Sequence, residues 1–192
     1  VSVRVIRSIE GANKIEESLG WRVYSPTREE ILASIESGLH PKTSLDVMPI
    51  HCFLPFVYPI NRKDERISGP MWIKNMGKKE VLQFMTEERV LEMCAPNAIK
   101  DDILSWTEKD FEYEKRRIVK SVKNLANEAN AIETPHHILV DSLSSWLKIG
   151  SPPSPKKLVK GIMDSGYCAS LTNYGRKPSI RTDAPWDLIV KL

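Results

Sequence analysis

The feature that most constrains the fold is a pair of short amphipathic segments in the last third of the chain. Apolar residues recur at helical spacing over residues 135–149, and Gly150–Ser154 then predicts a turn. Ser154 and Pro155 are typical of an N-cap followed by the first residue of a helix, which we expect to end near Gly166. The sequence therefore predicts two helices joined by a tight turn.

Two strand-like segments follow these helices. Residues 167–174 and 179–182 predict a hairpin, with a turn around residues 175–178. The order helix, turn, helix, hairpin is that of a winged-helix unit, in which the second helix faces nucleic acid. We therefore expect a winged-helix-like unit at residues 135–192.

Charge is concentrated in the same region. Residues 151–192 hold seven Lys or Arg and three Asp, a balance of +4, whereas the whole chain carries +3, so the rest carries −1. The three lysines of the second helix share one helical face, and two further cations fall at the tip of the wing. Such a charged face is also typical of a merely solvated helix, an alternative that the pattern leaves open. The candidate phosphate contacts are Lys156, Lys157, Lys160, Arg176, Lys177 and Arg181, with Tyr174 as a candidate for stacking on a base.

The first 134 residues mix strands and helices. Thr27 followed by Glu30 predicts a capping box at the start of one helix, which should stop near Gly38. We expect strands over residues 1–7, 21–24 and 53–58, and helices over residues 11–19 (ended by Gly20), 28–38 and 78–93. Residues 99–130 predict one long helix or a pair of helices. The expected fold class is α+β, with one part at residues 1–134 and a second at 135–192.

The sequence lacks the motifs that several classes of function require. The sequence contains no GxGxxG and no GxxxxGK[ST], so it predicts neither a dinucleotide site nor a P-loop site. It also lacks the glycine-bearing strand-to-helix turn that a Rossmann-type S-adenosylmethionine site requires. The three cysteines are widely spaced, so we expect no zinc site, no disulfide framework and a reducing compartment. No apolar run reaches the ~20 residues of a membrane helix. We expect no catalytic residue, metal or cofactor site in these residues, and no membrane partner. The chain starts at Val1 inside a strand-like segment, which we interpret as part of a longer product.

Three collinear motifs resemble one family. Gly166-Tyr167, Ser170-Leu171-Thr172 and Ile180-Arg181-Thr182-Asp183-Ala184-Pro185-Trp186 resemble the closing motif of the tRNA N2,N2-dimethylguanosine methyltransferases. Ser68-Gly69-Pro70-Met71-Trp72-Ile73 resembles the Gly-Pro-Leu-Trp segment of that family, and residues 1–19 resemble the opening of its C-terminal domain. Asn173 and Arg181 stand where the family has His and Lys, and the catalytic Asp-Pro-Phe-Gly motif has no match around Pro55-Phe56.

The resemblance implies the tRNA-binding C-terminal domain of an S-adenosylmethionine-dependent tRNA guanine-N2 (di)methyltransferase. It places the cofactor and the transferase chemistry in a catalytic domain, on the same polypeptide or on a separate subunit. The implied partners are tRNA and that domain, and the implied compartment is the cytoplasm, or the nucleus as well in a eukaryote. Asp183 should shape the last turn.

Two other functions remain open at this point. A winged-helix unit also suits a regulator that reads duplex DNA, which competition between DNA and tRNA would separate. The chain could instead be a structural subunit that completes the fold of a partner without catalysis. Association with a catalytic domain in gel filtration would test that reading.

Overall fold

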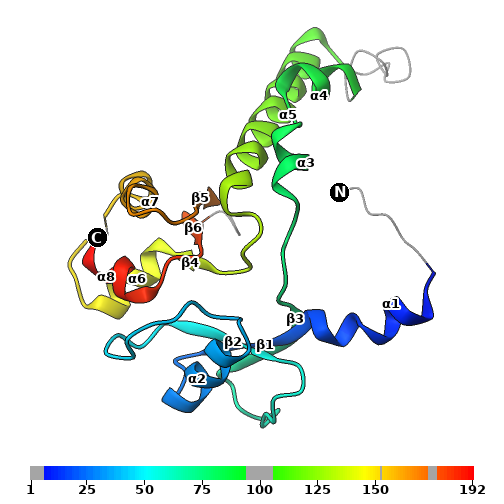
Figure 1. Cartoon of the computed structure of the whole chain (residues 1–192). Coiled ribbons are helices and arrows are strands. Elements are labelled where there is room, and N and C mark those ends of the chain that lie inside the picture. The colour runs from blue at the N-terminus through cyan, green and yellow to red at the C-terminus, as the bar shows by residue number, and fades with distance from the viewer. Residues whose placement is uncertain (1–6, 94–105, 152, 173–176) are drawn as a thin grey trace. The chain divides into compact units, whose positions relative to one another are not determined.

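The computed structural model describes residues 7–93, 106–151, 153–172 and 177–192 (Figure 1). It is a mixed α+β structure, and its described residues form eight α-helices and two small antiparallel sheets of three strands each. The predicted fold class is therefore confirmed. No helix in these ranges is long and apolar enough to cross a membrane.

Contacts between residues divide the chain into two compact units. Unit 1 combines Val1–Lys74 with Ala184–Leu192, and unit 2 is Asn75–Asp183. This division differs from the boundary that we expected after residue 134, which stays a prediction about functional domains. Each unit holds one of the two sheets.

The sheet of unit 1 has the order β2-β1-β3, with β1 in the centre. The elements of unit 1 are α1 (Ile9–Asn13), a 3-10 turn (Ile15–Ser18), β1 (Leu19–Tyr24), α2 (Arg28–Glu36), β2 (His51–Pro55), β3 (Ile67–Trp72) and α8 (Trp186–Lys191). Val23, Ile31 and Leu54 are fully buried where α2 packs against the sheet. The predicted capping box is confirmed, since the Thr27 side chain accepts from the backbone of Glu30 and the Glu30 carboxylate accepts from Thr27 N at 2.7 Å.

Gly20 is the clearest correction in unit 1. We expected it to end a helix over residues 11–19, but α1 ends at Asn13 and Gly20 lies inside β1. A Cβ at this position would lie 2.3 Å from the Leu54 carbonyl oxygen and 2.5 Å from Ile73 Cδ1. The glycine therefore permits close strand packing and has no role as a helix stop.

Gly69 serves the same close approach in the Gly-Pro motif. Its φ is +136°, and a Cβ there would lie 2.9 Å from the Gly20 carbonyl oxygen. The motif lies inside β3, whose register with β1 shifts between Gly20 and Arg22. The expected strand at 53–58 is shorter than predicted and begins earlier, at His51–Pro55. The expected strand at 1–7 lies almost wholly outside the described residues, and Arg7 itself is not in a strand.

Unit 2 contains the predicted order of helix, helix and paired strands. Its elements are α3 (Lys79–Gln83), α4 (Glu87–Met93), α5 (Glu108–Glu128), a 3-10 turn (Ala129–Ala131), β4 (His137–Leu139), α6 (Val140–Leu147), α7 (Pro155–Asp164), β5 (Ala169–Thr172) and β6 (Ser179–Thr182). The sheet order is β4-β6-β5, and α7 packs against β5 and β6 (Figure 1). Leu158 and Ile162 supply the buried face of α7, at 2% and 0% exposure.

Three boundaries in unit 2 differ from the prediction. We expected one helix over residues 135–149, but residues 137–139 form β4, which pairs with Ser179–Arg181 of β6. The expected helix over 78–93 is two helices, α3 and α4, separated at Phe84–Thr86. The part of the expected long helix before Trp106 lies outside the described residues. The N-cap at Ser154 and Pro155 as the first helical residue are confirmed.

Candidate nucleic-acid interface

Helix α7 has one buried face and one charged face. Lys156, Lys157 and Lys160 are all exposed, on the side opposite Leu158 and Ile162. No carboxylate of the described residues forms an ion pair with these three lysines. The first turn of α7 also holds no acidic side chain. The helix therefore presents to solvent three cations that form no ion pair with a described acid.

The other predicted contacts separate into three groups. Lys177 is exposed at the start of the segment that leads into β6. Tyr174 and Arg176 lie outside the described residues. Arg181 is only 4% exposed, and its guanidinium Nη1 donates to the Thr134 carbonyl oxygen at 2.7 Å. The structure therefore brings the α7 lysines together but holds Arg181 inside the unit.

Helix α5 carries a second basic face that we did not predict. Arg116, Lys120 and Lys123 are three or four residues apart, so they lie on one side of the helix, and all are exposed. Lys123 pairs with Glu87 of α4 at 3.0 Å, whereas Arg116 and Lys120 form no ion pair with a described residue. The signal was present in the sequence, because residues 115–123 hold five cations and no acid. Four acids at 108–114 mask it when the helix is summed as a whole.

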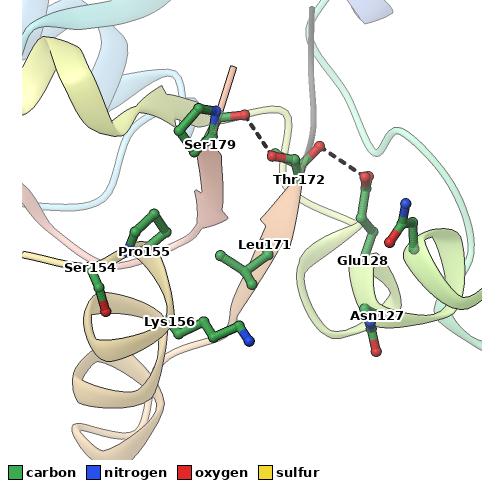
Figure 2. A pocket seen from close by; sticks show the side chains of 10 residues that line it. Asn127, Glu128, Ser154, Pro155, Lys156, Leu171, Thr172 and Ser179 are labelled. Atoms are coloured by element: carbon green, nitrogen blue, oxygen red, sulfur yellow. Dashed lines mark hydrogen bonds between the residues drawn. The ribbon is translucent and has the colours of Figure 1, made fainter. Parts of the chain in front are cut away.

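A pocket of about 360 Å³ lies between these two helices and the hairpin (Figure 2). The end of α5, the start of α7, and β5 with β6 line it; the residues are Asn124, Asn127, Glu128, Ser154, Pro155, Lys156, Leu171, Thr172, Pro178 and Ser179. Thr172 Oγ1 donates to Glu128 Oε1 at 2.9 Å, and Ser179 Oγ donates to the Thr172 carbonyl oxygen at 2.9 Å. These bonds fix the polar end of the pocket.

The closing motif shapes the hairpin and the turn after it. Asp183 Oδ1 accepts from Cys168 N at 2.8 Å, and Thr182 Oγ1 donates to the Cys168 carbonyl oxygen at 2.7 Å. In unit 1, Trp186 of α8 is 3% exposed and lies edge-on to the ring of His51. The expected turn-forming role of Asp183 agrees with its bond to Cys168. The motif is thus built from structural contacts in both units.

The described residues offer little for covalent or metal chemistry. Burial, and next the Glu30 carboxylate, raise the pKa of the Cys52 thiol to about 12, so a reactive thiolate is scarce at neutral pH. Among the residues that the structure describes, no three His, Cys, Asp or Glu side chains are grouped as metal ligands would be. Rossmann-type cofactor sites lie at the carboxyl edge of a parallel sheet, and both sheets here are antiparallel. The residues present do not fit an S-adenosylmethionine site of that type.

A family model identifies the family of this chain. The model of the N2,N2-dimethylguanosine tRNA methyltransferase family matches residues 58–192. The chain belongs to this family. The match covers two of the three motifs that suggested the family, the Gly-Pro segment and the closing segment.

A solved structure of a tRNA methyltransferase family member has the same fold. Trm1 from Pyrococcus horikoshii, solved in complex with S-adenosyl-L-methionine, superposes with a TM-score of 0.55 at 13% sequence identity. The alignment covers 95% of this chain and 37% of that chain. The protein described here therefore spans a little over a third of the length of that Trm1. No curated protein matches the chain.

Proposed function

We propose that this chain is the C-terminal, tRNA-binding domain of an S-adenosylmethionine-dependent tRNA guanine-N2 (di)methyltransferase. The observation that carries the proposal is the exposed lysine face of α7 in a chain of this family. It supports the proposal because the second helix of a winged-helix unit is the one that faces nucleic acid. Three unpaired cations on one helical turn and a half suit the phosphates of an RNA backbone.

The physical division of labour supports the same assignment. Double-stranded RNA is bound mainly through its shape and its phosphates, since its deep major groove admits no side chains that could read the bases. Basic helix faces such as those of α5 and α7 provide this kind of contact without sequence readout. The catalytic domain, on the same polypeptide or on a separate subunit, would hold the cofactor and transfer the methyl group.

The proposed contact residues are revised by the structure. Lys156, Lys157, Lys160 and Lys177 are kept because they are exposed, and Arg116 and Lys120 of α5 are added. Arg181 is dropped, because its burial and its bond to Thr134 favour a structural role. Tyr174 and Arg176 stay predictions from the sequence alone.

The test is equilibrium binding of an unmodified tRNA transcript over a range of salt concentrations. Changing Lys156, Lys157 and Lys160 together to Gln should weaken binding at least tenfold and lower the slope of log affinity against log salt by about one per lysine. The matched control changes Lys42, Lys63 and Lys74 of unit 1 to Gln, which removes the same charge elsewhere on the surface. Equal losses in the two variants would contradict the assignment of α7.

Competition separates this function from a DNA regulator. The same labelled tRNA should resist displacement by an excess of duplex DNA of mixed sequence, because contacts suited to A-form geometry are lost on B-form DNA. Displacement by DNA at equal concentration would favour the regulator. This experiment needs no variant and uses the intact chain.

A further inference from the structure

The pocket between α5, α7 and the hairpin combines an apolar side with a polar one. Pro155, Leu171 and Pro178 contribute apolar surface from α7, β5 and the segment before β6. Asn124, Asn127 and Glu128 contribute two carboxamides and a carboxylate from the last turns of α5. A flat ring with polar edges suits such a lining, since its faces contact carbon and its edge meets hydrogen-bonding groups.

The volume of the pocket is sufficient for a nucleobase. At about 360 Å³ it falls in the range of small-molecule sites, and it lies beside Lys156, the first lysine of the exposed face of α7. The unpaired cations Arg116 and Lys120 lie further along the same face of α5 that reaches the pocket at Asn124 and Asn127. An RNA backbone that follows these cations would therefore pass the mouth of the pocket.

The charge of Glu128 decides which part of a nucleotide enters. A carboxylate repels a phosphate but accepts hydrogen bonds from amino and ring N–H groups. Its Oε1 is held by the hydroxyl of Thr172, a residue with only 4% exposure, so the carboxylate has a fixed position. The Glu128 carboxylate accepts no other hydrogen bond from the described residues, which leaves acceptor capacity for a ligand.

We propose that this pocket binds an unstacked RNA nucleobase that carries an amino group, with its amino edge at Glu128 and its phosphate near Lys156. Adenine, cytosine and guanine have such a group, whereas uracil offers a single ring N–H that lies between two carbonyl oxygens, which a carboxylate repels. The proposal rests on the proposed function, because it assumes that RNA follows the basic faces of α5 and α7. It adds a site that distinguishes bases to a surface that otherwise contacts phosphates.

The test uses the four nucleoside 5′-monophosphates as probes of the intact, isotopically labelled chain. AMP, CMP and GMP should shift the NMR signals of Asn124 and Asn127, and should bind about tenfold more tightly than UMP, as expected for a hydrogen bond to a charged acceptor. Equal binding of all four, or shifts that avoid the pocket, would overturn the proposal.

Two variants separate base recognition from general electrostatics. Removing any negative charge near RNA should tighten non-specific binding. Glu92→Ala on α4 controls for this effect, because Glu92 is an exposed acid outside the pocket. Glu128→Ala should instead weaken AMP, CMP and GMP to the level of UMP. Asn127→Leu, at an exposed helix position, should weaken all four probes by filling the mouth of the pocket.

Failure of this proposal is distinguishable from failure of the proposed function. If the tRNA transcript binds with its expected dependence on the α7 lysines while no monophosphate reaches the pocket, the base site is wrong and the tRNA-binding function stands. If the transcript does not bind at all, both are wrong. Tighter binding of AMP, CMP or GMP to Glu128→Ala would also overturn the base site.

Discussion

The cations of the two units have different surroundings. In unit 1, the Arg66 guanidinium bonds to Glu30 at 3.2 Å and to Asp64 at 2.7 Å, and Glu30 also caps α2. In unit 2, Lys156, Lys157 and Lys160 project from α7 without an acidic partner among the described residues. An arginine that is already bonded to two carboxylates supports the fold and has little charge to offer a ligand, whereas an unpaired lysine contributes its charge to one.

The two groups of cations should therefore respond to different measurements. Loss of Arg66 should lower the free energy of unfolding and leave RNA affinity unchanged. Loss of an exposed lysine on α5 or α7 should do the reverse.

The largest expected effect is on stability, from matched core substitutions in the two units. Ile31 and Ile162 are each 0% exposed, the first on α2 and the second on α7. Changing either one to Ala should lower the free energy of unfolding by about 2–5 kcal/mol, because a buried methyl-rich side chain is replaced by a cavity. Denaturant titration measures the loss, and amide NMR signals should shift mainly within the unit that carries the change. Shifts spread evenly over both units would contradict the division.

Arg66→Gln should give the next largest effect. It leaves the Glu30 carboxylate, whose side chain is 11% exposed, without its cationic partner. We expect a loss of about 1–2 kcal/mol in the free energy of unfolding, reduced from the value for a buried pair because the Arg66 side chain is 37% exposed. The affinity for a tRNA transcript should not change. A weaker affinity with unchanged stability would reverse the contrast and place Arg66 in the interface.

The third prediction concerns the basic face of α5. Lys120→Gln should weaken tRNA binding about two- to fivefold and lower the salt slope by about one, while the free energy of unfolding stays within about 0.5 kcal/mol. Lys109→Gln is the control, since Lys109 lies in the acidic first turn of the same helix. If the two variants weaken binding equally, α5 has no specific contact face.

Local signals in the sequence predicted the elements that depend on their own residues. The capping box of Thr27 and Glu30 and the N-cap at Ser154 need only neighbours three residues away, and both are present in the structure. Strand β4 could not be found in this way. It is a strand because His137–Leu139 pair with Ser179–Arg181, some forty residues later, and this pairing overrides the helical pattern.

The candidate site shows the same difference between local signals and long-range contacts. The exposed lysines of α7 followed from helical spacing alone. The burial of Arg181 could not, because it depends on the Thr134 carbonyl across the sheet, 47 positions away in sequence. The pocket was also hidden, since its lining comes from α5, α7 and the hairpin. Sequence reasoning thus found the charge of the site and missed its shape.

The smallest expected effect is a change in pH dependence at the end of α8. Burial acts to raise the pKa of Asp187, but hydrogen bonds from Ser44 and Thr43 outweigh it, so the pKa lies below its usual value. A lowered pKa in the folded state means that Asp187 stabilises the protein above the unfolded pKa of about 3.9, and that this contribution is lost as pH falls from there through the folded pKa.

Asp187→Asn should therefore reduce stability slightly at pH 7 and flatten the loss of stability below about pH 4. Denaturant midpoints at pH 7 and pH 3 measure it, with Asp46→Asn as the exposed control. If the variant loses the same stability at both pH values, the geometry of the three hydrogen bonds stabilises the protein and the charge of Asp187 contributes nothing.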